Sequence, residues 1–293
     1  MAKLIVGCGY LGQRVAERWR RAGQEVWTLV RTETHAEELR RAGFQALAAD
    51  ITQPASLATL PECDTALFAA GYNPRCGGSR RAVYVDGLAN VLEALPPGVR
   101  RVIHISSTGV YGQTDGRWID ESAPCHPRRE GGAAFLAAEQ LLAGQAWAGR
   151  AVTLRLAGLY GPGRIPLKAD LLAARPIAVP AQVYLNLIHV DDAAAVVLAA
   201  EQARTPALYN VSDGQPVLRR AYYECLAELL HVAGVAFVNP PPGAPISPRS
   251  DSNKRIGNAR LMADLGVTLQ YPSYREGLAA IVAAEREAVD GGR

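Results

Sequence analysis

The stretch Lys3-Leu4-Ile5-Val6-Gly7-Cys8-Gly9-Tyr10-Leu11-Gly12 decides the fold of this chain. Residues 3–6 predict a buried strand, residues 7–12 have the spacing GxGxxG, and residues 13–19 have a helical pattern. In a dinucleotide-binding loop the first glycine permits a tight turn, the second lets backbone N–H groups approach a pyrophosphate, and the third lets the helix pack close to the strand. We therefore expect the pyrophosphate of a dinucleotide at the amino end of this helix.

The composition is that of an ordinary globular protein. Of the 293 residues, 49% are hydrophobic and 20% are charged, and the formal net charge of +3 is too small and too scattered to indicate binding of nucleic acid. No apolar stretch reaches the ~18 residues that a membrane span needs, and the first strand begins too early to leave room for a signal peptide. We expect a cytoplasmic protein whose partner is a small-molecule substrate, with neither nucleic acid nor a membrane as a partner.

The cysteines do not predict a disulfide framework. Their number is odd and no CxxC spacing occurs, which favours reduced thiols over disulfides or a zinc site. They are Cys8, Cys63, Cys76, Cys125 and Cys225. Only Cys8 has an argument for reactivity, because a helix N-terminus favours a thiolate; the alternative is a small side chain at a variable loop position. Histidines and carboxylates do not cluster, so we expect no metal.

Strands and helices alternate along most of the chain. Apolar runs predict strands at residues 25–30, 44–47, 65–71, 102–107, 151–156, 184–189 and 207–211, and helical periodicity predicts helices at 37–42, 54–60, 83–95, 133–147, 191–202, 219–231 and 274–289. The polar segment 114–132 is expected to be a loop beside the site. This pattern predicts an α/β protein with a Rossmann-like, doubly wound parallel sheet and a small C-terminal subdomain on the substrate side.

Two regions follow from this alternation. We assign residues 1–160 to the dinucleotide-binding Rossmann core. Residues 161–293 form a mixed region that returns strands and helices to the core and builds the small lobe. The crevice at the carboxyl ends of the strands is the expected ligand site.

Two strand ends bear on the choice of dinucleotide. Arg31 ends the second strand, where a site for NAD normally offers a carboxylate to the ribose 2′-hydroxyl. A guanidinium suits the 2′-phosphate of NADP, although a solvated surface arginine is the alternative. Asp50, with the amide of Ile51, is placed to meet the adenine, or else Asp50 caps the following helix. We expect NADP as the preferred cofactor, with NAD as the alternative.

Six motifs occur in a fixed order along the chain. They are Gly7–Gly12, Ala49-Asp50-Ile51, Ala69-Ala70-Gly71, Ser106–Gly112, Arg155–Gly163 and Ile188–Asp192. Together they resemble the extended short-chain dehydrogenase/reductase superfamily, which includes NAD(P)-dependent nucleotide-sugar epimerases and dehydratases. The resemblance covers almost the whole chain. The residues expected to bind the cofactor are Gly7, Gly9, Tyr10, Leu11, Gly12, Arg31, Asp50, Ile51, Ala69, Ala70, Gly71 and Ser106.

The resemblance implies a catalytic set that this chain has only in part. In the superfamily a Tyr is the acid/base, a Lys four residues later lowers its pKa and holds the nicotinamide ribose, and a Ser or Thr shares the hydrogen bond to the substrate. Ser107 matches the Ser/Thr position, but the Tyr and Lys positions fall on Gly131 and Phe135. The chain therefore resembles the atypical, YeeZ-like members that keep the fold and lack the Tyr-xxx-Lys pair.

Other groups are candidates for the chemistry at the substrate. Tyr111 is expected beside the nicotinamide and joins Ser107 as a catalytic candidate, the alternative being a packing role near the cofactor. His189 titrates near neutral pH, but a structural histidine and a helix cap at Asp191 are the simpler roles. Cations after the turn at residues 160–163 suit a phosphate or carboxylate. The residues expected to bind substrate are Thr108, Glu121, Tyr160, Arg164, Lys168 and Lys254.

The sequence thus supports two functions. The leading hypothesis is an NADP-preferring oxidoreductase or epimerase that acts on a small polar or nucleotide-sugar-like substrate with an altered acid–base set, Ser107 orienting the substrate oxygen. The alternative is a catalytically inactive NADP-binding sensor or scaffold, which the missing Tyr and Lys favour. The helices expected at 83–95 and 133–147 suit a homodimer joined by a four-helix bundle, although both could simply cover the sheet.

Overall fold

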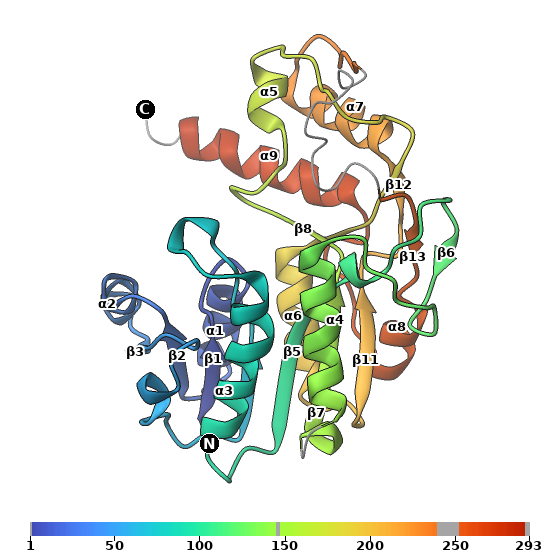
Figure 1. Ribbon diagram of the computed structural model, residues 1–293. Helices are drawn as coiled ribbons and strands as arrows, with labels where there is room; N and C mark the ends of the chain where they lie inside the picture. Colours follow the sequence, from blue (N-terminus) through green and yellow to red (C-terminus); the bar gives the residue numbers. More distant parts are fainter. Residues whose placement is uncertain (1, 145–146, 239–251, 291–293) are drawn as a thin grey trace.

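A seven-stranded sheet forms the centre of the molecule (Figure 1). The structure is a computed structural model, and it describes residues 2–144, 147–238 and 252–290. The strand order is β11-β7-β5-β4-β1-β2-β3, with every neighbouring pair parallel. These strands are β1 (Lys3–Val6), β2 (Val26–Val30), β3 (Gln45–Ala48), β4 (Thr65–Phe68), β5 (Arg101–Ser107), β7 (Ala151–Leu156) and β11 (Ala207–Val211). The predicted Rossmann-like, doubly wound fold is confirmed.

Helices cover both faces of this sheet, because the apolar strands must be buried on both sides. On one face lie α1 (Gly12–Arg21), α2 (Glu33–Arg41), α6 (Val190–Ala200) and α8 (Ala259–Leu265). On the other face, in front of the sheet in Figure 1, lie α3 (Gly87–Ala94) and α4 (Glu130–Ala143). The helices expected at 83–95 and 133–147 therefore pack on the sheet. The pairing of two copies through them stays a prediction, which a single chain does not test.

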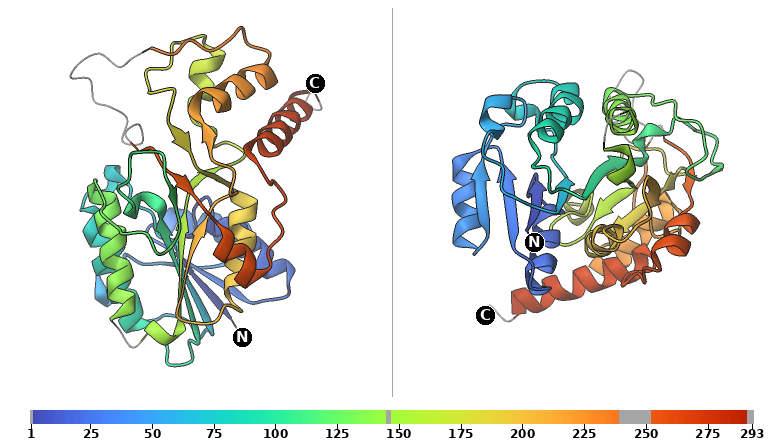
Figure 2. Two further views of the ribbon diagram at one scale, coloured as in Figure 1. Left: turned by 90° about the vertical axis from the view of Figure 1, so that its right-hand side faces the viewer. Right: turned by 90° about the horizontal axis from the view of Figure 1, so that it is seen from below.

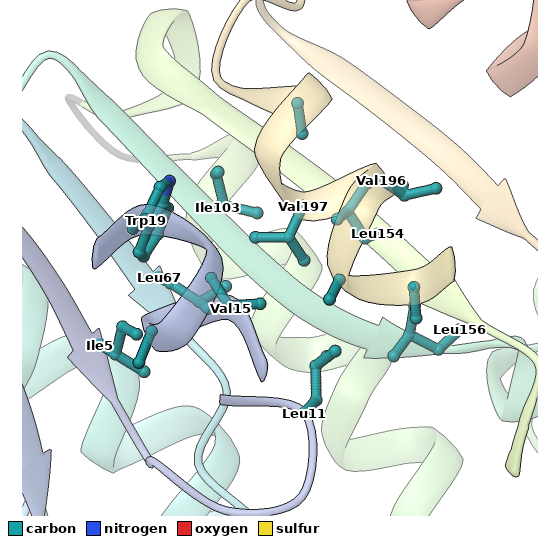
Figure 3. Close-up of a cluster of buried hydrophobic side chains, with 14 of the residues drawn as sticks. Ile5, Leu11, Val15, Trp19, Leu67, Ile103, Leu154, Leu156, Val196 and Val197 are labelled. Carbon is teal, nitrogen blue, oxygen red and sulfur yellow. The ribbon is translucent and has the colours of Figure 1, made fainter. Parts of the chain in front are cut away.

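The core on the α1 face joins the two halves of the sheet. Figure 3 shows Val15 and Trp19 of α1 lying between strand residues such as Leu67 and Val197 of α6. Trp19 is 1% exposed, and burying a side chain of this size stabilises the fold by about 1.5–3 kcal/mol or more. Its indole N–H also donates to the carboxylate of Glu201. This packing fixes the start of α1, and with it the glycine loop, against the sheet.

A smaller lobe lies beyond the carboxyl ends of the strands. It contains α5 (Lys168–Leu172), α7 (Arg219–Leu230) and α9 (Tyr274–Asp290), which lie together above the sheet in Figures 1 and 2 and share their own apolar core. Three short strand pairs connect lobe and sheet: β8 (Gly158–Tyr160) with β10 (Leu187–His189), β9 (Tyr184–Leu185) with β12 (Val217–Leu218), and β6 (Trp118–Ile119) with β13 (Arg255–Ile256). α6, β11 and α8 return to the core of the sheet. Residues 161–293 therefore contribute both to the Rossmann core and to the small lobe.

Several helices differ from the expected boundaries. α2 begins at Glu33, earlier than expected, because the side chain of Thr32 accepts a hydrogen bond from the His35 N–H and caps it. α4 begins at Glu130 and ends at Ala143; of the expected helical residues, 145–146 lie outside the described part. The helix expected at 83–95 starts as a π-helix. The short helical turns are η1 (Pro54–Leu57), η2 (Pro74–Cys76), the π-helix η3 (Ala82–Asp86), η4 (Thr108–Val110) and η5 (Ala148–Arg150).

The expected strand at 184–189 and the expected loop at 114–132 are also corrected. The strand divides into β9 and β10, which pair with different partners because Asn186 between them binds the backbone of residues 254 and 256. The loop contains β6, whose partner β13 is too far along the chain to be anticipated from local pattern. Among the described residues, no helix is long and apolar enough to cross a membrane.

Candidate functional site

The glycine loop between β1 and α1 is shaped by close packing at two positions and by open space at the third. Gly7 has φ +93°, and a Cβ there would lie 2.5 Å from Cα of Ala70. A Cβ at Gly12 would lie 2.6 Å from the carbonyl oxygen of Gly7. At Gly9, by contrast, nothing lies within 4 Å of the Cβ position. The missing side chain at Gly9 therefore leaves room over the loop, and this room fits a pyrophosphate.

A cavity of about 690 Å³ opens over this loop at the carboxyl ends of the strands. It brings together eleven of the twelve residues expected to bind the cofactor: Gly7, Gly9, Tyr10, Leu11, Gly12, Arg31, Asp50, Ile51, Ala69, Ala70 and Gly71. Apolar side chains, among them Ile105, Phe135, Leu156 and Leu159, line other parts of it, and Arg164 also borders it. A largely apolar cavity with a few polar groups is the usual form of a small-molecule site.

The strand ends that were expected to select the dinucleotide both border the cavity. Arg31 is exposed directly after β2. Asp50 is half-buried, and its Oδ1 accepts hydrogen bonds from the backbone N–H and the hydroxyl of Thr52, at 2.9 and 2.8 Å. It therefore closes a local turn and does not cap the next helical turn, whose N-cap is Gln53.

Tyr10 links the glycine loop to the turn that follows β8. Its hydroxyl donates to the carbonyl oxygen of Pro162 at 3.1 Å, and its ring lies against the guanidinium groups of Arg14 and Arg164, at 4.3 and 5.3 Å from the ring centroid. Arg14 in turn pairs with Asp191 at 3.1 Å. These contacts hold Arg164, a predicted substrate residue, beside the loop that would carry the pyrophosphate.

The two serines at the end of β5 face different partners. Ser106 is 2% exposed, and its hydroxyl donates to Oε1 of Glu139 at 2.5 Å. This hydroxyl is therefore not free for the cofactor, and the expected cofactor contact of Ser106 stays a prediction. Ser107 is half-buried at the carboxyl end of the strand, and its Oγ accepts the Gly109 N–H at 3.0 Å. Its own proton is therefore left to donate.

Tyr111 is part of a buried polar network and lies outside the lining of the cavity. Its phenol oxygen lies 2.7 Å from a nitrogen of Arg155, 2.9 Å from Oδ1 of Asn210 and 3.1 Å from the carbonyl oxygen of Asp120. Burial raises the pKa of Tyr111 to about 12, although Arg155 acts in the opposite direction. The expected acid–base role of Tyr111 does not fit this placement, because the hydroxyl is enclosed and already hydrogen-bonded.

The same network contains a buried ion pair between the sheet and α4. Two nitrogens of Arg155 donate to the two carboxylate oxygens of Glu139, at 3.0 and 2.6 Å, and both side chains are less than 8% exposed. Sequence reasoning missed Glu139. The available signal was a carboxylate and a guanidinium inside two otherwise apolar segments, because a charge at such a position needs a partner.

In the first two turns of α4, Gly131 and Phe135 stand where the superfamily resemblance implies a tyrosine and a lysine. At Gly131 a Cβ would lie 3.6 Å from Cδ of Arg80, so the arginine side chain runs beside this bare part of the helix. Phe135 stacks on Tyr84 with the ring centroids 4.3 Å apart, and both residues line the cavity. Arg80 and Tyr84 were not predicted as site residues. Their signal would have been tertiary, since they precede α4 by about 50 residues in the chain.

The predicted substrate residues Thr108, Glu121 and Lys254 lie near this network. Thr108 is buried at the start of η4. Glu121 accepts the backbone N–H of Asn210 at 2.7 Å, which ties its loop to β11. Lys254 is 5% exposed, and its Nζ donates to the carbonyl oxygen of Tyr111 at 3.2 Å and to the Ser252 hydroxyl at 2.8 Å. Burial, with a smaller contribution from Arg129, lowers the pKa of Lys254 to about 8.

The remaining predicted residues have structural partners elsewhere. Tyr160 is 1% exposed, and its hydroxyl donates to the carbonyl oxygen of Ser273 at 3.4 Å. Lys168 forms an ion pair with Glu285 of α9 in the small lobe. These two positions do not join the cavity over the glycine loop.

His189 and Cys8 also have structural placements. Nδ1 of His189 accepts the Asp191 N–H at 3.2 Å at the start of α6, and burial lowers the pKa of the imidazole. The structural role that sequence favoured therefore fits. Burial raises the pKa of Cys8 to about 12, so a thiolate at this position is disfavoured. Among the described residues, no group of three or more His, Cys, Asp or Glu side chains could hold a metal ion.

Comparison with known proteins agrees with this architecture. Residues 4–212 match the model of the NAD dependent epimerase/dehydratase family, and the chain belongs to this family. Protein YeeZ of Escherichia coli (strain K12) is 28% identical over 275 residues, covering 92% of this chain and 95% of that protein. A solved structure from Methylobacillus flagellatus, provisionally assigned as an NAD-dependent epimerase/dehydratase, is 34% identical with a TM-score of 0.80, covering 98% of this chain and 99% of the other.

A third relative is named as a reductase. The 3-diazoavenalumate denitrifying reductase of a Streptomyces species is 27% identical over 309 residues, covering 95% of this chain and 99% of that protein. The superfamily that the sequence motifs indicated is thus confirmed.

Proposed function

We propose that this protein is an NADP-preferring oxidoreductase that acts on a small polar substrate without the usual tyrosine and lysine. The observation that carries the proposal is the single cavity that joins the open space over Gly9, the exposed guanidinium of Arg31 and the apolar wall at Ile105 and Phe135. Membership of an NAD-dependent family supports a nicotinamide cofactor in this cavity.

The residues present have separate tasks in this proposal. The loop at Gly7–Gly12 holds the pyrophosphate through backbone N–H groups, and Arg31 pairs with a 2′-phosphate. A nicotinamide, when bound, supplies or accepts a hydride. Ser107 orients a substrate oxygen by donating a hydrogen bond from its hydroxyl, because its Oγ already accepts the Gly109 N–H and its own O–H stays available. The substrate is a small polar or nucleotide-sugar-like molecule.

A reductase is favoured here over an epimerase. The support for this choice is the Streptomyces relative, whose name is that of a reductase. The enclosure of Tyr111 does not distinguish the two reactions, because both need a proton at the substrate oxygen. The alternative is a sensor or scaffold that binds NADP and turns nothing over. The arrangement at Gly131 and Phe135 is compatible with it.

The test compares cofactor binding in matched charge variants. By isothermal calorimetry, wild type should bind NADPH more tightly than NADH. Arg31→Asp should weaken the binding of NADPH by about 10- to 100-fold, because a charge-assisted hydrogen bond contributes about 1.5–3 kcal/mol. Arg100→Asp is the control, since Arg100 is exposed and lines a different cavity with Ala2 and Glu25. Equal affinity for NADPH and NADH would remove the NADP preference.

Turnover separates the enzyme from the sensor. A panel of small aldehydes, ketones and nucleotide sugars is screened for NADPH oxidation with wild type and Ser107→Ala. The proposal expects a substrate whose turnover falls in Ser107→Ala while NADPH affinity stays unchanged. NADPH binding with no turnover across the panel favours the sensor, and full turnover in Ser107→Ala contradicts the role of Ser107.

A further inference from the structure

The cavity over the glycine loop crosses the strands of the sheet in their spatial order. Its lining includes Asp50 after β3, Arg31 after β2, Gly9 after β1, Gly71 after β4 and Ile105 on β5. A dinucleotide consists of two nucleosides joined by a pyrophosphate. The proposed function has the pyrophosphate over β1 and the adenosine over β2 and β3. The second ribose, with its nicotinamide, then belongs over β4 and β5.

The side chain of Tyr84 borders this second half of the cavity. Tyr84 is 8% exposed, its ring stacks on Phe135 with the centroids 4.3 Å apart, and both residues line the cavity. The phenol oxygen of Tyr84 accepts the backbone N–H of Tyr72 at 3.1 Å. The residues on either side of this amide, Gly71 and Asn73, also line the cavity. The hydroxyl end of Tyr84 therefore lies in the part of the wall that follows β4.

This hydroxyl has one hydrogen bond left to give. A tyrosine hydroxyl can accept and donate at once, and the N–H of Tyr72 uses it as an acceptor. Within the described part of the chain, no oxygen or nitrogen accepts the proton of Tyr84. Buried polar groups are ordinarily hydrogen-bonded, so an oxygen of a bound ligand would be stabilised here. Tyr84 also lies in the middle of the π-helix η3, and such segments are frequent at functional sites.

We propose that Tyr84 holds the ribose of the nicotinamide half of the cofactor by donating its hydroxyl proton to a ribose hydroxyl group. The stacked ring of Phe135 and the N–H of Tyr72 fix the phenol in the orientation that this bond needs. In this inference, which rests on the proposed function, Tyr84 is a binding residue and keeps its proton.

The test compares two fragments of NADP by isothermal calorimetry. Adenosine 2′,5′-bisphosphate lacks the second ribose, whereas ADP-ribose 2′-phosphate contains it and lacks only the nicotinamide. Tyr84→Phe should weaken the binding of ADP-ribose 2′-phosphate by about three- to tenfold, because one neutral hydrogen bond is lost, and should leave adenosine 2′,5′-bisphosphate unchanged. Tyr209→Phe is the matched control, since Tyr209 is 2% exposed, its hydroxyl bonds to Asp264, and it does not line the cavity.

A second measurement separates a contact with the ribose from support of the backbone at Tyr72. NADP analogues whose nicotinamide ribose lacks either the 2′- or the 3′-hydroxyl are titrated into wild type and Tyr84→Phe. The two proteins should bind equally the analogue that lacks the bonded hydroxyl, and they should differ for NADP itself. The same loss in Tyr84→Phe with NADP and with both analogues would show that Tyr84 only supports the backbone, and it would overturn the inference.

The remaining outcomes separate this inference from the proposed function. Equal affinity of wild type and Tyr84→Phe for ADP-ribose 2′-phosphate overturns the inference and leaves the proposed function intact. A loss with both fragments also overturns it, because the effect is then not confined to the second ribose. If wild type binds adenosine 2′,5′-bisphosphate no more tightly than AMP, the NADP preference fails. Tyr84 is then tested in the same way with ADP-ribose and AMP.

Discussion

The cofactor side and the substrate side of this molecule use their polar groups differently. On the cofactor side, Arg31 is exposed at a strand end, and Gly9 leaves the space over its loop open. On the side assigned to the substrate, Glu139 accepts hydrogen bonds from Ser106 and Arg155 in the interior. The first region leaves groups exposed at the cavity to which we assign the cofactor, whereas most groups of the second cross-link α4 to the sheet. Perturbed polar residues near a site are therefore not all functional.

The largest expected effect concerns the cross-link on the substrate side. Arg155→Met leaves the Glu139 carboxylate buried without its guanidinium and should lower the free energy of unfolding by about 3–5 kcal/mol. Urea unfolding followed by circular dichroism at pH 7 measures this loss. The double variant Arg155→Met with Glu139→Leu should regain most of it, because no buried charge remains. A single variant as stable as wild type would show that the pair does not hold α4.

The next effect concerns the cofactor side. It distinguishes a glycine that leaves room for a ligand from a glycine that is required by the packing of the fold. Gly9→Val should weaken NADPH binding by more than about 100-fold, which corresponds to about 2.8 kcal/mol, with little change in stability. Gly7→Val should instead destabilise the fold, because its Cβ would meet the backbone of Ala70 and its φ is +93°. Calorimetric titration and thermal unfolding of both variants make the comparison. Unchanged NADPH affinity in Gly9→Val would show that the pyrophosphate does not bind at this loop.

A pH-dependent effect tests whether Lys254 is kept at a cost to stability. Burial lowers the pKa of Lys254 to about 8 in the fold, from its ordinary value of 10.5, so between these values the unfolded chain binds more protons and stability rises with pH. Below pH 8 the buried charge disfavours the fold. Relative to Lys254→Met, wild type should therefore gain about 2 kcal/mol between pH 7 and pH 10.

Urea unfolding of both proteins across this pH range measures the difference. Arg100→Met serves as the control, because an arginine does not titrate here and its difference from wild type should stay flat. A flat difference for Lys254→Met as well would mean that its ammonium is not destabilised by burial.

The smallest effect concerns Tyr111. Tyr111→Phe removes a buried hydroxyl from the network and should cost about 1 kcal/mol of stability. If the tyrosine is structural, the variant leaves NADPH affinity and the pH profile of any turnover unchanged. Loss of turnover with an altered pH profile, at unchanged stability, would restore Tyr111 as an acid–base candidate.

How much of the site the sequence predicts depends on how far apart in the chain the interacting residues lie. The glycine loop, Arg31 and Asp50 were predictable because each lies at the end of a strand, and parallel strands bring their carboxyl ends to one edge. The pair of Glu139 and Arg155 was missed because it joins a helix to a strand. The periodicity of the helix and the apolar run of the strand do not tell which of their side chains face each other. The hydroxyls of Ser106 and Tyr111 bind Glu139 and Asn210 in the interior, and the motif did not predict these partners because it does not reveal which way a hydroxyl points.

The sequence by itself determined the doubly wound fold, the glycine loop and the absence of the Tyr-xxx-Lys pair, because these depend on local periodicity and on residue types at short spacings. Only the tertiary structure decided that Lys168 pairs within the small lobe while Lys254 is buried beside Tyr111 and near Arg129. The reason is physical: the state of a charge depends on its burial and on its neighbours, and those neighbours come from distant parts of the chain.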